Sequence, residues 1–405
     1  MRALYICYFG ISEPLVNTQV IPYLRELTSY GHAIHLLTFE PLDSAVHDPT
    51  LCADWKKRMG DYGITWHWIT YHQGGTITKL MDVISGAFRA VQIVYAHQLK
   101  LLHARSHMAM AMAMLAQLFT NTKTIFDIRG LQAEEYMDAG IWCEDSFAFR
   151  TMKWLERTGT RRANRIVVLT ERMKKYVMER YSIPGEKIHV IPCCVDTGAY
   201  AETAKQTKPS ERFTVIYAGS ATGLYLLAEM AEFVTALRKY RPESFLHVLT
   251  ASPVVAATDV ILQAGLSSDG FCVERVNPQD VAKHAAQAQI GISFRKATIS
   301  QIAASPTKIP EYLAAGVPVV SNAGIGDMDA VIEGSRVGVL IRDFTSQGLD
   351  EGAKEILELM KDQNLRDRCQ TTAKDSFDLK SIGGNRYNTV YGQLEDQNGG
   401  NSFRQ

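Results

Sequence analysis

One stretch constrains the fold of this chain more than any other: Ser305-Pro-Thr-Lys-Ile-Pro-Glu-Tyr-Leu-Ala-Ala-Gly-Val-Pro-Val-Val320. Ser305 and Thr307 are residue types that cap helix N-termini, and a proline is well tolerated in a first helical turn. Gly316 is a typical helix stop, and the apolar residues after Pro318 are typical of a buried parallel strand. The stretch therefore predicts a turn, a short helix and a buried strand.

Two charged residues of this short helix indicate what it binds. Lys308 lies in the first turn, where the helix dipole disfavours a cation unless an anion is also present. Glu311 follows one turn later, and a carboxylate there can accept hydrogen bonds from two adjacent hydroxyl groups, as a ribose offers. The pattern predicts a nucleotide site, with Ser305 and Thr307 in its phosphate-binding turn. An ordinary surface helix with a solvated lysine and glutamate is the alternative that the local pattern leaves open.

The longer motif Pro306-Thr-Lys-x-x-Glu311-Tyr-Leu-Ala-Ala-Gly-x-Pro-Val-Val320 resembles the donor-nucleotide motif of the retaining glycosyltransferases of family 4, which have the GT-B fold. Asn322-Ala-Gly-Ile-Gly-Asp327 and Val337-Gly-Val339 resemble the way such chains continue. The resemblance extends over nearly the whole chain and is strongest in the second half. It implies an α/β protein of two doubly wound parallel-sheet domains, similar to Rossmann domains, that face each other across a cleft.

The composition fits such a fold and narrows the partners. The 405 residues suffice for two domains, and a hydrophobic content of 46% lets both build cores. A formal net charge of zero and a pI of about 7.2 give no argument for nucleic acid as a partner. The seven cysteines include no C-x-x-C pair, so we expect a reduced, cytoplasmic protein without structural zinc. We expect neither a signal peptide nor a membrane-spanning segment, and peripheral contact with the inner face of a membrane stays open.

Two openings of the βαβ type predict the domain boundaries. One lies within residues 3–38, and the pattern restarts at residues 213–217. Pro192-Cys-Cys-Val-Asp196 resembles the family's crossover between domains, and the polar residues 202–211 are expected to form the linker. The expected parts are an acceptor-binding domain over residues 1–195, a donor-binding domain over 196–376, a helix over 377–395 that returns to the first domain, and a flexible tail over 396–405.

The first strand-to-helix loop of the N-terminal domain contains Gly10 and Ser12. It lacks the G-x-G-x-x-G fingerprint, which argues against a dinucleotide-dependent dehydrogenase. The resemblance implies that this loop lies over the donor diphosphate and next to the acceptor. An ordinary strand-to-helix turn is the alternative for each single residue.

Ionisable residues follow two later strands of the same domain. His103 and Arg105 end one strand, and Asp127 and Arg129 end the next. Ligands bind at the carboxyl ends of parallel strands. The family resemblance implies that acceptor and reaction-centre groups lie here, so we expect His103 and Asp127 in catalysis and both arginines beside the diphosphate and the acceptor. A hydrogen-bonded structural histidine is the alternative. Many family members have a histidine immediately before this aspartate, where the chain has Phe126.

The second domain supplies further candidates for the donor site. Family members usually show Gly-Arg after its first strand and a lysine a few residues on, whereas this chain has Gly219 and Ser220. Lys308 and Arg295 must then carry more of the charge that neutralises the diphosphate. The resemblance further implies that the backbone around Val276 meets the nucleobase. The family often has a glutamate where this chain has Ala303.

The resemblance thus implies an enzyme that moves a sugar, with retention of configuration, from a nucleotide-diphosphate sugar to an acceptor hydroxyl. Lys308, Gly219, Ser220 and Arg295 would stabilise the leaving diphosphate, and Glu311 would orient the ribose. No cofactor and no metal are expected, because the helix dipole and these cations would hold the diphosphate. The expected acceptor is a carbohydrate or a lipid-linked glycan, in glycan or surface-polysaccharide synthesis. A nucleotide-sugar epimerase on the same fold and a non-catalytic partner protein remain the alternatives.

Overall fold

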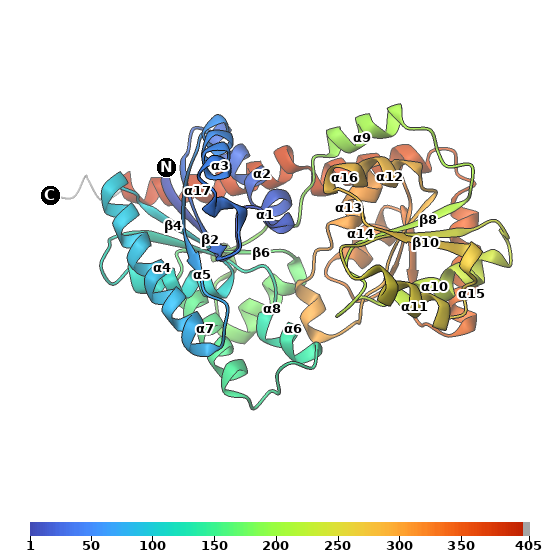
Figure 1. The fold of residues 1–405 in the computed structure, drawn as a ribbon, viewed down its shortest axis with the longest axis horizontal. Coiled ribbons are helices and arrows are strands. Elements are labelled where there is room, and N and C mark those ends of the chain that lie inside the picture. The colour runs from blue at the N-terminus through green and yellow to red at the C-terminus, as the bar shows by residue number, and fades with distance from the viewer. Residues whose placement is uncertain (400–405) are drawn as a thin grey trace. The chain divides into compact units, whose positions relative to one another are not determined.

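The computed structural model describes residues 1–399 as two units, each built on one parallel sheet (Figure 1). Met1–Pro192 and the chain from Leu379 onward form unit 1, and Cys193–Asp378 form unit 2. Both boundaries lie within a few residues of those expected from the sequence. The two doubly wound parallel sheets confirm the predicted α/β class, with two Rossmann-like units as in the GT-B fold.

Unit 1 has a seven-stranded sheet in the order β3-β2-β1-β4-β5-β6-β7. Its strands are β1 (Arg2–Cys7), β2 (Ala33–Pro41), β3 (Ile64–Tyr71), β4 (Leu101–Arg105), β5 (Lys123–Asp127), β6 (Arg165–Val168) and β7 (Ile188–Val190). Its helices are α1 (Pro14–Gln19), α2 (Ile21–Ser29), α3 (Pro49–Asp61), α4 (Thr76–His97), α5 (Ser106–Ala116), α6 (Gln132–Asp138), α7 (Phe147–Arg162), α8 (Glu171–Tyr181) and α17 (Asn385–Gly399). The strand order reverses between β1 and β4, and ligands of such sheets bind beyond the carboxyl ends at that point.

Unit 2 has a six-stranded sheet in the order β10-β9-β8-β11-β12-β13. Its strands are β8 (Thr214–Ala218), β9 (Phe245–Leu249), β10 (Phe271–Glu274), β11 (Ile290–Ser293), β12 (Val319–Asn322) and β13 (Gly338–Ile341). Its helices are α9 (Thr197–Gln206), α10 (Leu227–Arg238), α11 (Val254–Gln263), α12 (Val281–Gln287), α13 (Lys308–Ala314), α14 (Met328–Gly334), α15 (Ser346–Leu359) and α16 (Leu365–Phe377). Two apolar clusters cover the faces of this sheet, one under α10, α11 and α15 and one under α9, α12, α13 and α16.

The short helix predicted around Lys308 and Glu311 forms as expected, as α13. The residues before it form a 3₁₀ segment, Ile299–Ala303, and α13 then begins at Lys308. Gly316 has a φ of +78°, a left-handed conformation that glycine adopts without a steric penalty, and it ends the helical segment before β12. The reversal of strand order between β8 and β11 places this segment at the switch point of the second sheet.

Two expectations about chain segments are wrong. Residues 202–206, expected in a linker, belong to α9, whose N-terminus is capped by the Asp196 carboxylate accepting a hydrogen bond from the Ala199 N–H. The expected flexible tail begins inside α17, which continues to Gly399. The rest of that tail, residues 400–405, lies outside the described residues. No helix within residues 1–399 is long and apolar enough to cross a membrane.

Candidate functional site

Lys308 begins α13 and turns its ammonium group onto two tyrosine rings. Its Nζ lies 4.0 Å from the ring centre of Tyr225 and 4.5 Å from that of Tyr217, and it donates a long hydrogen bond of 3.4 Å to the Tyr217 hydroxyl. The residue is only 5% exposed. Burial, followed by the charge of Arg295, lowers the pKa of Lys308 well below its ordinary value. An anion beside this amine would raise its pKa again and favour the charged form, so the environment of Lys308 favours anion binding.

Arg295 reaches the same tyrosine from the end of β11. Its guanidinium carbon lies 4.7 Å from the ring centre of Tyr225, and Nη1 donates to the Tyr225 hydroxyl at 3.0 Å. Nε donates to Gln301 Oε1 at 2.6 Å. The backbone of Arg295 is held by the Asn322 side chain, which accepts from its N–H and donates to its carbonyl. Two cations therefore gather at one aromatic ring with neutral hydrogen-bonding partners, which is the charge balance of an anion site.

Gly219 makes room for the lysine rather than donating to a ligand. A Cβ at this position would lie 2.8 Å from Lys308 Nζ and 3.1 Å from the Tyr217 hydroxyl. The Gly219 N–H donates to the Leu249 carbonyl at 2.9 Å, so it does not serve the backbone role expected from the sequence. Ser220 is exposed, and its hydroxyl oxygen accepts from the Thr222 N–H at 3.2 Å. Ser220 therefore offers an accessible hydroxyl group, whereas Gly219 leaves space for Lys308.

Glu311 lies one turn along α13 and is partly buried. The Tyr200 hydroxyl of α9 donates a hydrogen bond to its carboxylate. Burial raises the pKa of Glu311 to about 7, although Lys308 and the Tyr200 hydrogen bond act in the opposite direction. Tyr200 was not among the sequence candidates, and no local pattern singles it out, because its partner lies far along the chain.

The remaining donor-site candidates of unit 2 are brought near the same helix. The Ser305 hydroxyl accepts a hydrogen bond of 3.0 Å from the Cys193 N–H, so it holds the start of unit 2 in place. Thr307 occupies the cap position of α13 but makes no side-chain capping bond. Val276 follows β10 and packs, partly buried, against an apolar cluster. Ala303 is completely buried in the 3₁₀ segment.

In unit 1, a buried glutamate organises the loop after β1. Glu40 Oε1 accepts from the Ile11 N–H at 2.8 Å and from the Thr38 hydroxyl at 2.6 Å. A Cβ on Gly10 would lie 2.9 Å from Glu40 Oε2, so only glycine fits there without a shift. Ser12 is exposed. The loop is therefore held from below by Glu40, a residue that the sequence patterns did not identify, and presents Ser12 to solvent.

His103 and Asp127 lie in the core of unit 1, both at 0% exposure. Asp127 accepts a hydrogen bond of 2.9 Å from the Tyr387 hydroxyl, and His103 Nδ1 lies 2.9 Å from the Tyr391 hydroxyl. Burial lowers the pKa of His103, and cationic neighbours hold the pKa of Asp127 below its usual range despite its burial. Such burial argues against contact with a substrate, so the expected catalytic roles gain no geometric support.

The two arginines of unit 1 lie next to this core. Arg129 Nη1 is 3.4 Å from Asp127 Oδ1, and Nη2 is 3.4 Å from Gln19 Oε1. Arg105 is 4% exposed, and its Nε and Nη1 have no hydrogen-bond partner in the part of the chain that the structure describes. A buried guanidinium without partners is costly, because desolvation is not offset. An anionic ligand group at the carboxyl end of β4 would supply what Arg105 lacks.

Two groups of side chains among residues 1–399 have the spacing of metal ligands, His35 with His67 and His97, and His247 with Cys272 and Glu274. Neither includes a residue assigned above to the donor or the acceptor.

Comparison with known proteins identifies the relatives of this chain. The model of Glycosyltransferase Family 4 matches residues 16–199, which covers most of unit 1 and the start of unit 2. A search of curated proteins finds no match.

Solved structures match nearly the whole chain. A glycosyltransferase from Rickettsia africae aligns with a TM-score of 0.71 at 14% identity, covering 97% of this chain and 98% of that one. HepE of Anabaena, solved in complex with UDP and glucose, aligns with a TM-score of 0.68 at 16% identity, covering 96% and 99%. A Listeria monocytogenes chain described as a UDP-N-acetylglucosamine 2-epimerase aligns with a TM-score of 0.61 at 12% identity, covering 98% and 96%. At these identities the likeness establishes the fold.

Proposed function

We propose that the chain, which is similar to Glycosyltransferase Family 4 over residues 16–199 and has the GT-B fold, transfers a sugar from a nucleotide-diphosphate sugar to an acceptor hydroxyl with retention of configuration. Unit 2 binds the donor, and unit 1 binds a carbohydrate or lipid-linked glycan acceptor. The observation that carries this proposal is the meeting of Lys308 and Arg295 on the ring of Tyr225. Such a pair is suited to the charge that develops on a departing diphosphate.

Each residue of the proposed donor site has a separate role. Lys308 and Arg295 stabilise the leaving diphosphate, Glu311 accepts hydrogen bonds from the ribose hydroxyls, and Ser220 donates to a phosphate oxygen. Because two side-chain cations already neutralise the diphosphate, the transfer requires no metal. The departing phosphate itself assists attack from the same face of the sugar, so the chain supplies no nucleophile of its own.

A uridine nucleotide is the first donor to test. HepE of Anabaena shares the fold and was solved with UDP and with UDP-glucose. We predict that the backbone around Val276 contacts the base. Guanosine and adenosine nucleotides are tested for comparison with the uridine nucleotide. In unit 1, the unpartnered guanidinium of Arg105 favours an acceptor that carries a phosphate, as a lipid-linked glycan does.

The test is a thermal-shift panel of UDP, GDP and ADP and their glucose conjugates, followed by a turnover assay. One nucleotide at a hundredfold excess over its Kd should stabilise the wild type by ~2.7 kcal/mol. Lys308→Met and Arg295→Gln should lose this stabilisation. Lys296→Ala is the matched control, because Lys296 is an exposed cation next to Arg295 and should retain it.

The outcomes separate the alternatives. Transfer to an acceptor with an unchanged anomeric configuration, unaffected by EDTA, supports the proposal in full. Isomerisation of free UDP-sugar without an acceptor would mean an epimerase. The absence of any nucleotide effect on the wild type would mean a non-catalytic member of the fold.

We also propose that unit 1 rests on an anionic membrane surface through α4. This helix exposes large apolar side chains along one face over its whole length, at Ile77, Leu80, Met81, Ile84, Phe88 and Tyr95. Helix residues at these spacings share one side, whereas the opposite side packs into the core. The Tyr95 hydroxyl donates to the Phe119 carbonyl, which continues the apolar surface onto the exposed Leu118 and Phe119.

Cations lie close to the end of this apolar surface. Lys100, Lys123 and Arg162 line one hollow together with Asn121 and Thr122, which are separated from Phe119 along the chain by Thr120 alone. Apolar burial combined with attraction to anionic headgroups is the usual basis of interfacial binding. The contact fits an acceptor that is itself lipid-linked.

A further inference from the structure

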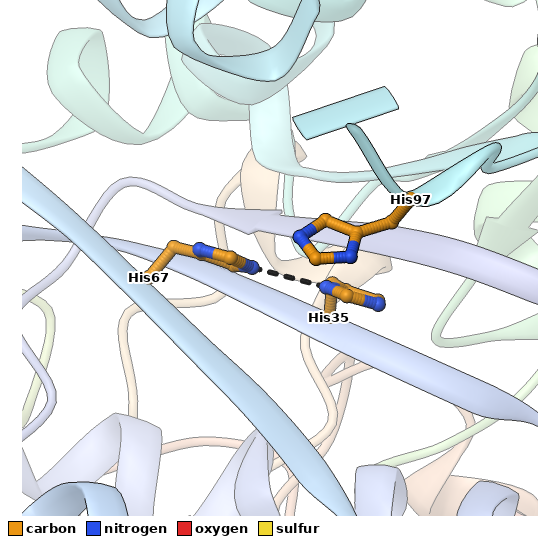
Figure 2. A group of neighbouring side chains, drawn as sticks. All are labelled: His35, His67 and His97. Carbon is orange, nitrogen blue, oxygen red and sulfur yellow. Dashed lines mark hydrogen bonds between the residues drawn. The ribbon is translucent and has the colours of Figure 1, made fainter. Parts of the chain in front are cut away.

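Three histidines from different elements meet on one side of the first sheet. His35 lies near the start of β2, His67 in the middle of β3, and His97 is the last residue of α4 (Figure 2). One nitrogen from each ring can be chosen so that all three lie within 4.8 Å of one another. His35 Nδ1 and His67 Nε2 are 3.0 Å apart and share a hydrogen bond, drawn as a dashed line in Figure 2.

The three imidazole rings lie close together among cationic neighbours. The ring centres of His35 and His97 lie 4.3 Å apart, and those of His67 and His97 lie 5.6 Å apart, so His97 faces both partners. The other charged groups that influence the cluster are cations, Arg2 near His35 and Arg89 near His67. A cluster of protonated imidazoles would therefore repel itself and its neighbours. Burial and these charges lower the pKa of His35 and of His67 to about 4, so both rings are neutral at pH 7 and keep a lone pair.

We propose that His35, His67 and His97 bind one divalent transition-metal ion, with Zn²⁺ as the physiological occupant. Three neutral imidazoles are a ligand set that suits Zn²⁺, Ni²⁺ and Cu²⁺, whereas Ca²⁺ and Mg²⁺ prefer oxygen ligands. Zn–N bonds of about 2.0–2.1 Å in a tetrahedral arrangement separate two ligand nitrogens by about 3.3 Å. His35 Nδ1 and His67 Nε2 are already close to that spacing.

The third ligand and the open position follow from exposure. His35 is buried and His67 half-buried, whereas His97 is exposed at the end of its helix, so a rotation of the His97 side chain can complete the set. Water from the solvent side then fills the fourth position. Arg2 and Arg89 oppose a dication, so we expect weaker binding than at a site with a carboxylate ligand.

The metal would act on stability rather than on sugar transfer. His35 and His67 come from neighbouring strands, of which β3 is the edge strand, and His97 comes from the helix that packs over this part of the unit. A bound ion would fasten the edge of the sheet to the end of α4, which carries the proposed membrane surface. The three residues lie away from the carboxyl ends of the strands, where Ser12 and Arg105 belong.

The test measures Co²⁺ and Zn²⁺ binding to the full chain after removal of metals with EDTA. His97→Ala is the decisive variant, because the residue is exposed and its loss leaves the core intact. His47→Ala is the matched control, since His47 is another exposed histidine of unit 1. Cys272→Ala reports on the second group of possible ligands, His247, Cys272 and Glu274.

We expect one Co²⁺ per chain with the visible bands of a tetrahedral nitrogen site and without a thiolate charge-transfer band. Zn²⁺ should displace it and raise the melting temperature. His97→Ala should weaken Zn²⁺ binding at least ~10-fold, whereas His47→Ala and Cys272→Ala should bind as the wild type does. Equal binding by His97→Ala and the wild type, no binding at all, or a thiolate band lost with Cys272→Ala would each overturn the proposal.

Discussion

The residues of the donor site are held in ionisation states that a ligand would change. Lys308 is buried beside Arg295, and both effects lower its pKa, so the charged form of the amine is disfavoured until an anion arrives. A diphosphate next to Nζ would raise that pKa again. Binding of the donor should therefore be accompanied by uptake of a proton.

The first prediction is that UDP binding is accompanied by net proton uptake at neutral pH. Isothermal titration calorimetry in buffers with different ionisation enthalpies measures this uptake directly. Lys308→Met should abolish the uptake, and Lys296→Ala should preserve it. A buffer-independent binding enthalpy in the wild type would contradict the role given to Lys308.

Glu311 provides a second prediction, on stability. Its pKa rises from 4.5 to about 7 on folding, because burial favours the protonated form. The folded state then binds more protons than the unfolded state between about pH 4.5 and pH 7, so stability is greatest below this window and falls as the pH rises through it. The free energy of unfolding should fall by at most ~3 kcal/mol across this window. Glu311→Gln should remove most of this pH dependence, which urea unfolding at a series of pH values measures. An unchanged slope would show that Glu311 is ionised throughout.

Gly10 provides a third prediction. Gly10→Ala should destabilise unit 1 by about 1–3 kcal/mol, because its Cβ would press on the buried Glu40 carboxylate that holds the loop after β1. Gly60→Ala is the matched control. Gly60 lies in α3 with no atom within 4 Å of an added Cβ, so alanine should stabilise that helix by about 0.5–1 kcal/mol. Thermal unfolding of the three chains measures both effects.

At the scale of the elements, local signals predicted a helix or strand where an apolar pattern and a cap agreed. Ser146 caps α7 by accepting from the Phe149 N–H, and Thr170 caps α8 by accepting from the Met173 N–H. The helix α3 has a clear cap in Asp48 but a weak apolar pattern, because Met59 is its only fully buried residue. Residues 202–206 of α9 were expected in a linker because their composition is polar, and the packing of α9 against α12 and α13 decides their conformation.

The fourth prediction concerns the exposed face of α4. The wild type should float with vesicles that contain anionic lipid and less well with neutral vesicles or at high salt. The double variant Ile84→Glu and Phe88→Glu should stay in solution, because charged side chains on that face cannot enter the headgroup region. Lys79→Glu is a control for charge alone, since Lys79 lies on the same helix outside the apolar face. Flotation of the double variant at the wild-type level would exclude this surface.

At the scale of the whole molecule, the chain assembles unit 1 from both of its ends. After leaving unit 2 at Asp378, it contributes α17, whose Tyr387 and Tyr391 meet Asp127 and His103 in the core of unit 1. These contacts join residues that are 260 and 288 positions apart along the chain. They explain why a histidine and an aspartate that looked catalytic are instead enclosed by aromatic side chains.

The fifth prediction follows from this assembly. Tyr387→Phe removes the hydrogen bond to a buried carboxylate and should destabilise unit 1 by about 1–3 kcal/mol, without weakening nucleotide binding by unit 2. Scanning calorimetry with and without UDP measures both: the variant should lower the transition of unit 1, and UDP should raise that of unit 2. A loss of UDP binding in Tyr387→Phe would contradict this division.

The sequence by itself determined the fold class, the two sheets and the helix that carries Lys308 and Glu311, because turns, caps and apolar runs act over a few residues. Only the tertiary structure decided which of the chemically able residues meet. It brought Arg295 to Lys308 across Tyr225, paired Tyr200 with Glu311 and gathered three histidines at one sheet edge. It also enclosed His103 and Asp127. The physical reason is that burial and charge pairing depend on neighbours in space, which strand order and helix packing select and which local spacing does not reveal.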